Sequence, residues 1–366
     1  MVKLDFYGGA AGGAAGGAAG GAAGGAAGAT LGWYTVSEAL RKSRDGIANP
    51  SDSTTYVDTL KLAAPDFPTP ALPLIDRLAN RLTHWDSWVI PALILPELLR
   101  PVAYKGVSAN SVTMTINGGK VLKLNRPSIS IFRGQLANVI AEADLRDDRA
   151  SEILAQAIDI RPFFESVLPI GADRTPATWT LINIAMQLAL HIEMRFKHEF
   201  ACARPFEYSS QVQPMIRTPA HGTYPSGHGC ESRVMAEVLI ALTAPAIATD
   251  ASTALAQQLR ALAKRIGDNR IVAGVHFPTD QDAGDFLGAR IARYFVTTAS
   301  LGKWTLVQTQ GGNSEIEIFE PNPSQSGADG LQTEDSGEVQ AAISLPVIEE
   351  LKWHWTVARK EWAWLN

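Results

Sequence analysis

The stretch Thr178–Leu190, TWTLINIAMQLAL, decides the fold class of this chain. Its apolar residues occupy nearly every face of a helical period, so protein must cover this helix on all sides. Helical apolar spacing also marks further segments, at Ile131–Ala143, Asp148–Val167, Thr175–Ala203, Gly229–Leu242, Thr253–Arg265 and Asp280–Thr297. We therefore predict a mostly α fold, a helical bundle with the Thr178–Leu190 helix at its centre.

A period-two stretch interrupts the helical pattern. Over Ser111–Leu124, apolar residues alternate with threonines, and Asn117-Gly118-Gly119 is typical of the turn of a β-hairpin. Thr305–Gln308 and Glu315–Phe319 also resemble strands, whereas the acidic, Ser/Gly-rich segment Asn322–Val339 resembles a loop. The sequence thus predicts small β-hairpin additions to the bundle.

One segment is excluded from this prediction. Gly8–Gly28 repeats Gly-Gly-Ala-Ala and has no side chain that could bury a core or hold a ligand, which favours an inserted linker over a natural loop. Four regions follow from these patterns. They are an extended segment with the Gly/Ala linker (1–28), N-terminal helices and the hairpin packing on the core (29–130), the catalytic helical bundle (131–300), and an extension with short strands and a Trp-rich tail that its tryptophans anchor on the surface (301–366).

Composition excludes several classes of protein. With 46% apolar and 19% charged residues in 366, the chain is too apolar to be disordered. A net charge of −5 argues against broad binding to nucleic acid or an anionic membrane. Cys202 and Cys230 cannot form a disulfide framework. Because no apolar run reaches bilayer length and MVKLDFY does not resemble a signal peptide, we expect a soluble protein of unknown compartment.

Three clusters in the second half combine cations with histidines. They are Lys197 with Arg204-Pro205, His221 with Pro225-Ser226-Gly227-His228, and Asn269-Arg270 with His276 and Asp280. Fixed positive charges suit an oxyanion, and the entry into a helix at Ser226-Gly227 adds backbone N–H groups. His228 and His276 can exchange protons or act as neutral ligands near neutral pH. The combination predicts an oxyanion pocket with two histidines in different roles.

Each cluster alone has a simpler interpretation. Lys197 can complement the dipole at a helix C-terminus, and Pro225–Gly227 can be a turn and a cap. His276 can be a surface or core histidine. Only the combination of the three favours a functional pocket.

In order and spacing, these clusters resemble a known three-part signature. Lys197-x6-Arg204-Pro205, Pro225-Ser226-Gly227-His228 and Arg270-x5-His276-x3-Asp280 are similar to the signature shared by type-2 phosphatidic acid phosphatases, class A acid phosphatases and vanadium-dependent haloperoxidases. Asn269 departs from the serine that usually precedes the arginine in the phosphatases. The absence of membrane-length apolar runs and the stretch Thr218–Tyr224 favour the haloperoxidases. His221 stands where the bromoperoxidases of that family carry a second active-site histidine, although it can also be a solvent-facing loop residue.

The resemblance implies vanadate as the cofactor, in a site that phosphate can also occupy. His276 would be its protein ligand, and the groups around its oxygens would be Lys197, Arg204, Arg270, the Gly227 N–H and the Ser226 hydroxyl. His228 would accept a proton from hydrogen peroxide, Lys197 would polarise the peroxide, and a halide would be oxidised to halogenate a small organic acceptor. The family also implies a possible homo-oligomer.

Two alternatives to the haloperoxidase stay open. In a soluble acid phosphatase, His276 would be the phosphoryl nucleophile and His228 the acid. A non-catalytic oxyanion-binding protein is the third reading. Asp280 is equally open, because it can either orient His276 or cap the following helix.

Overall fold

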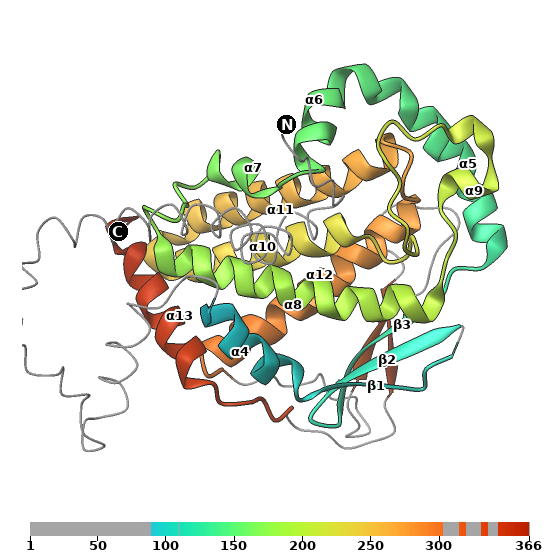
Figure 1. The fold of residues 1–366 in the computed structure, drawn as a ribbon. Helices are drawn as coiled ribbons and strands as arrows, with labels where there is room; N and C mark the ends of the chain where they lie inside the picture. Colours follow the sequence, from blue (N-terminus) through green and yellow to red (C-terminus); the bar gives the residue numbers. More distant parts are fainter. Residues whose placement is uncertain (1–88, 109, 303–314, 320–330, 336–342, 366) are drawn as a thin grey trace, which may run out of the picture. The chain divides into compact units, whose positions relative to one another are not determined.

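The computed structural model describes residues 89–108, 110–302, 315–319, 331–335 and 343–365. All of these residues belong to one compact unit of the chain. Helices dominate the unit, so the predicted mostly α fold is confirmed (Figure 1). The predictions for residues 1–88 and for Thr305–Gln308 lie outside the described residues.

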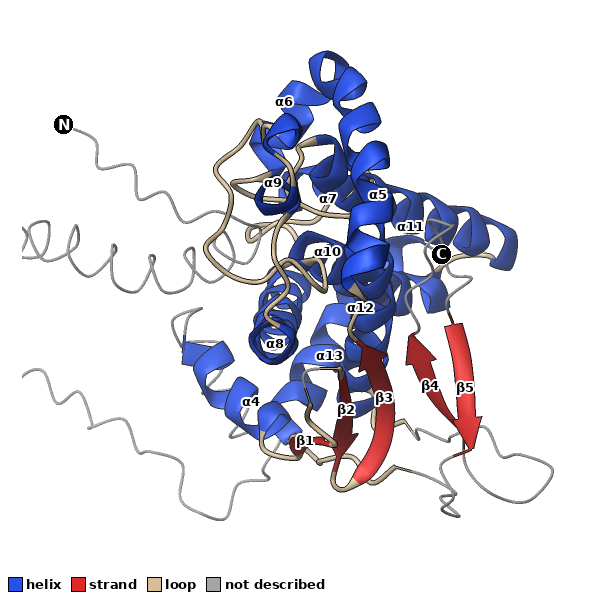
Figure 2. Cartoon of the chain, turned by 90° about the vertical axis from the view of Figure 1, so that its right-hand side faces the viewer, coloured by secondary structure: helices blue, strands red, loops and turns tan. Residues whose placement is uncertain are grey.

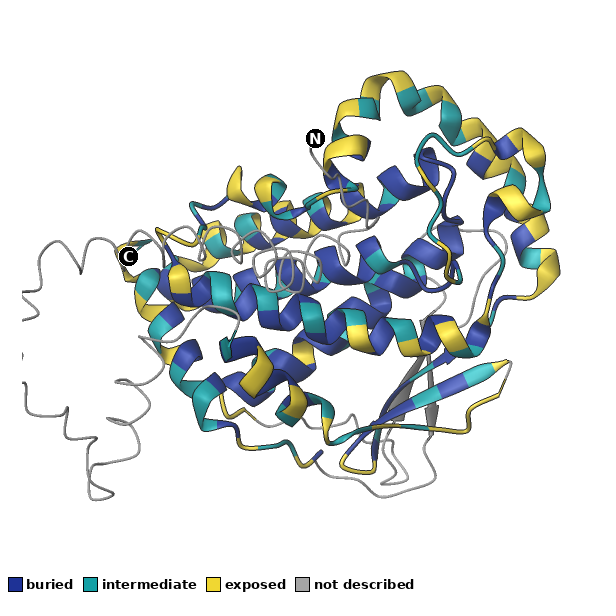
Figure 3. Ribbon diagram, viewed as in Figure 1, coloured by how far each residue is buried: buried dark blue, intermediate teal, exposed yellow. Residues whose placement is uncertain are grey.

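Four long helices form the body of the bundle: α8 (Pro176–Phe200), α10 (Gly227–Thr243), α11 (Thr249–Val272) and α12 (Pro278–Ala299). The central helix is α10, which packs against the other three and exposes none of its residues (Figure 3). The Thr178–Leu190 stretch of α8, predicted to lie at the centre, likewise has no exposed residue, so the prediction that protein covers this helix on all sides is confirmed. The interior position of α10 was not predicted, because its sequence contains charged residues. In the structure, Arg233 pairs with Asp285 and Glu237 pairs with Arg260, so these charges are neutralised.

Close packing of α10 against α12 depends on two glycines. A Cβ on Gly284 would lie 2.5 Å from the Ser226 carbonyl oxygen, and one on Gly288 would lie 2.4 Å from the Cys230 carbonyl oxygen. Since neither distance is possible between real atoms, any side chain here would push the two backbones apart. The small residues therefore set the position of the start of α10.

The segment Asp148–Val167, predicted as one helix, forms two. Helix α6 (Arg146–Gln156) ends before Asp159, and α7 (Arg161–Glu165) begins after it. The Asp159 carboxylate accepts the backbone N–H of Arg161 at 2.9 Å, and Pro162 stands in the first turn of α7. This local cap competes with helix continuation and explains the break. Helices α5 (Ile129–Glu142) and α9 (Pro205–Tyr208) pack against each other, and α4 (Val89–Leu99) packs against α8.

A five-stranded sheet lies beside the helices, with its strands in the order β1-β2-β3-β4-β5 (Figure 2). Its strands are β1 (Val102–Lys105), β2 (Ser111–Ile116), β3 (Gly119–Asn125), β4 (Glu315–Phe319) and β5 (Leu331–Asp335). The predicted hairpin is confirmed as β2 and β3, with Asn117 and Gly118 both at positive φ in the turn.

The two C-terminal strands extend this hairpin. Strand β4, which was predicted, pairs in parallel with β3, and β5 pairs antiparallel with β4. The prediction of a loop over Asn322–Val339 was wrong for Leu331–Asp335. The backbone of this polar segment forms a strand because it pairs with β4.

The C-terminal tryptophans, which were predicted to anchor a tail on the surface, lie in and after a helix. Helix α13 (Glu349–Glu361) packs against α8, and Trp355 and Trp362 are buried. The Glu361 carboxylate accepts the N–H groups at the start of α8, from Ala177 at 2.8 Å and Thr178 at 2.9 Å. The carboxylate thus caps a helix far from it in sequence. Among the described helices, none is long and apolar enough to span a bilayer.

Candidate active site

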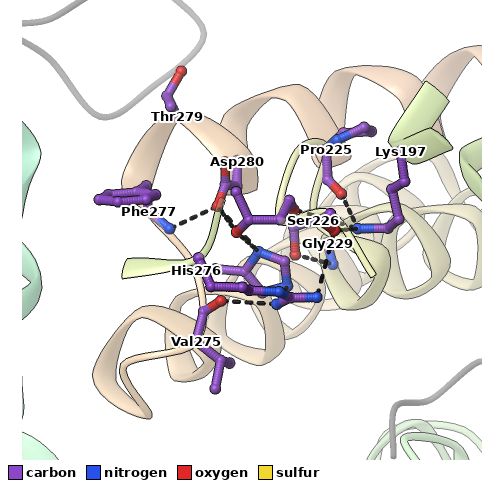
Figure 4. A network of polar contacts seen from close by, with 12 residues as sticks. Lys197, Pro225, Ser226, Gly229, Val275, His276, Phe277, Thr279 and Asp280 are labelled. Atoms are coloured by element: carbon purple, nitrogen blue, oxygen red, sulfur yellow. Dashed lines mark hydrogen bonds and ion pairs between the residues drawn. The ribbon is translucent and has the colours of Figure 1, made fainter. Parts of the chain in front are cut away.

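The predicted site residues lie where the helices of the bundle begin and end. Figure 4 shows four of them close together: Lys197, Ser226, His276 and Asp280. Lys197 lies in the last turn of α8, and Arg204 precedes α9. The loop before α10 carries His221 and Ser226, and Gly227 and His228 begin that helix. Arg270 lies in the last turn of α11, His276 in the loop after it, and Asp280 in the first turn of α12.

The short loop that carries His276 is held from both sides. Gly274 has φ +79°, a left-handed conformation that side chains disfavour, and it turns the chain between α11 and His276. The Arg146 guanidinium donates to the carbonyls of Val272 (2.9 Å), Gln213 (2.9 Å) and Val212 (3.0 Å). Arg146 therefore ties this loop to the chain that follows α9.

The ring of His276 is held through both nitrogens. Nδ1 lies 3.1 Å from Asp280 Oδ2 and 3.1 Å from Thr223 Oγ1, and Nε2 lies 3.2 Å from the Arg204 guanidinium. Because a carboxylate only accepts and a guanidinium only donates, the proton belongs on Nδ1 and the lone pair on Nε2. Burial, then the charges of Arg204 and Lys197, lower the pKa of His276 well below its usual value, which keeps the ring neutral.

Asp280 contacts His276 and also caps the start of α12, so it makes both of the contacts that the sequence left open. Its Oδ2 contacts His276 and also accepts the Phe277 backbone N–H, at 2.8 Å, at the start of α12. The Thr223 hydroxyl donates to the same oxygen. Burial raises the pKa of Asp280 to about 6, so the carboxylate stays largely ionised at neutral pH.

Arg204 is buried and spans several loops. It donates to the carbonyls of Val275 at 2.8 Å and His221 at 3.1 Å, besides its contact with His276. Burial lowers its pKa to about 10, still far above neutral pH. The guanidinium is therefore a fixed positive charge beside the lone pair of His276.

Lys197 is buried and faces the loop before α10. Its ammonium donates to the carbonyls of Gly222 (3.4 Å), Thr223 (3.3 Å) and Pro225. Burial lowers its pKa, whereas Glu193 opposes this shift. These three carbonyls use all three donors of the ammonium, so its contact with an oxyanion remains a prediction.

Ser226 begins α10 as its N-cap. Its hydroxyl oxygen accepts the Gly229 N–H at 3.2 Å, and its own N–H donates to the Asp280 carbonyl at 2.8 Å. The hydroxyl proton is not used in the cap, and the Gly227 N–H belongs to the first turn of the helix, where no earlier carbonyl accepts it. The start of α10 thus presents donors suited to an anion.

His228 lies one residue further and is buried. Its Nε2 lies 3.0 Å from the Gln156 carbonyl oxygen, which places the proton on Nε2 and the lone pair of the neutral ring on Nδ1. Burial and the charge of Arg270 lower the pKa of His228 well below its usual value. The His228 ring is therefore neutral near pH 7.

Arg270 offers the strongest sign that this site can bind an anion. It is 1% exposed, and its Nη2 donates to the Ile153 carbonyl at 3.0 Å and to Gln156 Oε1 at 3.2 Å. Its Nε and Nη1 have no hydrogen-bond partner among the residues that the structure describes. Buried guanidinium nitrogens without acceptors are costly, and the two oxygens of an oxyanion would satisfy them. The residues present therefore fit vanadate or phosphate.

His221 lies at the exposed edge of this group. Its Nδ1 is 3.2 Å from an Arg204 nitrogen and 3.1 Å from the Gly222 carbonyl oxygen. Partial burial and the charges of Lys197 and Arg204 lower its pKa. The structure thus places His221 beside the pocket, accessible from solvent, and its role stays a prediction.

Three polar residues of the site were missed by the sequence analysis. Thr223 lies in the stretch that carried the resemblance, and Glu193 is a lone acid one turn before Lys197, so both left a signal. Gln156 left none, because only the packing of α6 against α11 brings it to Arg270, His228 and Asn269.

Comparisons with known proteins agree with this geometry. Residues 207–301 match the family described as the VCPO second helical-bundle domain. The non-specific acid phosphatases of Salmonella typhi and Salmonella typhimurium are 29% and 28% identical to this chain over 125 residues. These alignments cover 33% of this chain and 46% of each phosphatase, so the chain spans just under half the length of the curated relatives it matches.

Together these matches support the superfamily of vanadium haloperoxidases and acid phosphatases, and an enzyme of that superfamily. They do not favour the bromoperoxidase-like branch over the others.

Proposed function

We propose that this chain is a vanadate-dependent haloperoxidase that favours bromide. The reaction converts hydrogen peroxide, a halide ion and a proton into hypohalous acid and water, and the hypohalous acid then halogenates a small organic acceptor. The observation that carries the proposal is the state of His276. Asp280 at 3.1 Å holds its Nδ1 proton, so the lone pair lies on Nε2, which contacts Arg204 at 3.2 Å and could serve as a ligand.

The oxyanion would be held by groups of opposite charge and by donors. Arg270 contributes the two nitrogens that have no partner among the described residues, and Arg204 contributes its charge beside His276. The hydroxyl proton of Ser226 and the N–H of Gly227 complete the set at the start of α10. Bound vanadate supplies a Lewis acid that activates peroxide without changing its own oxidation state.

His228 would move the proton of the incoming peroxide. Its Nε2–H is held by the Gln156 carbonyl, so Nδ1 is the atom that accepts a proton. The lowered pKa keeps Nδ1 unprotonated before peroxide arrives. The same atom then returns the proton to the departing water.

A second candidate, an acid phosphatase, is favoured by the curated relatives. Nε2 of His276 would attack phosphorus while the leaving oxygen takes a proton from His228. This requires a protonated His228, and the negative charge of a bound phosphate ester would raise the pKa of the ring toward that state.

Parallel assays separate the two reactions. The purified protein is incubated with orthovanadate and tested for peroxide-dependent bromination of a chromogenic acceptor, and without vanadate for hydrolysis of an aryl phosphate. We expect vanadate-dependent bromination, with little hydrolysis. Hydrolysis alone, inhibited by vanadate, would make the chain a phosphatase, and the absence of both would favour a non-catalytic oxyanion-binding protein.

Two histidine variants test the roles within the site. His276→Ala should abolish retention of vanadate, whereas His228→Ala should retain vanadate and lose turnover. His191→Ala is the matched control, because His191 is an exposed histidine on α8 whose Nδ1 contacts only a carbonyl of its own helix among the described contacts. Equal vanadate affinity in the wild type and His276→Ala contradicts the proposed ligand.

A further inference from the structure

The described part of the chain contains a buried acid next to the oxyanion pocket that the proposed reaction does not use. Glu193 lies on α8, one turn before Lys197, and is 0% exposed. Neither of its carboxylate oxygens has a hydrogen bond of ordinary geometry within the described residues. Because an unpaired carboxylate is strongly disfavoured in the interior, this position requires an explanation.

The Glu193 carboxyl lies directly against the start of α10. A Cβ on Gly227 would be 2.7 Å from Glu193 Oε1, so only the absence of a side chain at Gly227 leaves room for the carboxyl. Gly227 is also the residue whose backbone N–H is proposed to hold an oxyanion. The Glu193 carboxyl group and a bound oxyanion would therefore both lie next to Gly227.

The groups that act on Glu193 come from three elements. Lys197 on α8 has the largest charge effect, the weakly donating Cys230 thiol lies beside it on α10, and Arg204 contributes from the start of α9. From α12, Asp280 acts on Lys197. The acid that α13 brings to α8, Glu361, is bound at Ala177 and Thr178, at the opposite end of the helix. Glu97 of α4 is half-buried and paired with Arg100.

These charges make the protonation of Glu193 depend on whether an oxyanion occupies the pocket. Without an oxyanion, its negative charge offsets the buried ammonium of Lys197. When an oxyanion occupies the pocket, it supplies that negative charge itself, and an ionised Glu193 would add repulsion between like charges in a medium that screens them poorly. Burial already raises the pKa of Glu193, so little free energy is needed to protonate it near neutral pH.

We propose that Glu193 is a positioning residue that takes up a proton when an oxyanion binds at Gly227. The ionised carboxyl holds Lys197 charged in the empty pocket, and the protonated carboxyl lets a full negative charge enter. This inference rests on the proposed oxyanion pocket, and it holds for a haloperoxidase and a phosphatase alike.

Infrared difference spectroscopy tests the proposal directly. Tungstate is a suitable probe, because it remains a dianion throughout the neutral range and does not itself bring or release protons. Adding it to the wild type at about pH 8, where carboxyl groups are normally ionised, should produce the carbonyl band of a protonated carboxyl group, shifted in heavy water. The band should be lost in Glu193→Gln, which should still bind tungstate by calorimetry.

Two further variants make the result specific. Glu231→Gln changes a second fully buried carboxyl group, which lies on α10, and should keep the band. Glu193→Asp should move the frequency of the band, and it serves if Glu193→Gln does not fold. Persistence of an unchanged band in both Glu193 variants overturns the proposal, as does tungstate binding to the wild type without any band.

The experiments give a different result if the proposed oxyanion pocket does not bind tungstate. If calorimetry detects no tungstate binding to the wild type, the oxyanion pocket is refuted, and the role of Glu193 is refuted with it. If the wild type binds tungstate and Arg270→Ala does not, the pocket stands, and the infrared band alone decides the role of Glu193.

Discussion

The Asp280 oxygen that lies 3.1 Å from His276 Nδ1 also accepts the backbone N–H of Phe277, at 2.8 Å. One carboxylate oxygen therefore orients the histidine and closes the first turn of α12. The position of the His276 ring is thus tied to the position of the helix, and not to the flexible torsions of its own side chain. Such coupling explains how a loop residue can be held well enough to serve as a ligand or a nucleophile.

Replacing the Asp280 carboxylate should remove the restraint that ties the His276 ring to α12. Asp280→Asn leaves the size of the side chain unchanged but allows its amide to donate to Nδ1, which would move the ring proton to Nε2. We expect tungstate affinity, and whichever activity the chain has, to fall by about 10–100-fold. Calorimetry and the two assays measure this, with Asp282→Asn, a half-buried aspartate of the same helix, as the control. Equal affinity in the wild type and Asp280→Asn would show that Asp280 only caps the helix.

The buried His228 predicts a pH dependence of stability. Its folded-state pKa lies well below the value of 6.5 for an unperturbed histidine, so below that pH the unfolded chain binds a proton that the folded chain does not. Stability from this group is therefore present above about pH 6.5 and is lost as the pH falls, by up to about 1.4 kcal/mol for each pH unit. Urea unfolding between about pH 7 and about pH 5 should give a smaller loss of stability in His228→Gln than in the wild type. Parallel curves for the two proteins would contradict this origin.

The exposed His221 should influence the choice of halide. His221→Phe removes the contact of Nδ1 with Arg204 at 3.2 Å and replaces a polar ring edge with an apolar one. If the chain is a haloperoxidase, we expect a change in the ratio of chloride to bromide turnover, with folding unaffected. The ratio is measured under saturating peroxide. An unchanged ratio would return His221 to the role of a solvent-facing loop residue.

Because α10 and α12 are in close contact, we expect that adding even one methyl group between them lowers the stability of the protein. Gly288→Ala would place a Cβ 2.4 Å from the backbone oxygen of Cys230, so the helices must separate. We expect a loss of about 1–3 kcal/mol in the free energy of unfolding.

The matched control for this variant is Gly134→Ala, within α5. No atom lies within 4 Å of a Cβ there, and the change should raise stability by about 0.4–1 kcal/mol. Urea unfolding of both variants decides the point, and a Gly288→Ala protein as stable as the wild type would show that the helices can adjust freely.

Much of the fold could be predicted from local patterns. The helical spacing around Thr178–Leu190 and the Asn117-Gly118 turn indicate structures that form from neighbouring residues, and both the mostly α class and the hairpin are confirmed. Strand β5 could not be predicted, because its polar sequence forms a strand only beside β4. The break at Asp159 was missed for a different reason, since helical spacing hides a single capping side chain.

For the candidate site, the sequence alone determined which residue types occur and in what order: three cations, two histidines and a helix start at Ser226. These features depend on spacing along the chain, which the sequence states directly. Only the tertiary structure decided the partners of each group. Gln156 reaches Arg270 and His228 from a distant helix, because burying the apolar face of α6 brings it there. The protonation of the site depends on such partners and on burial, and both arise only when the helices pack.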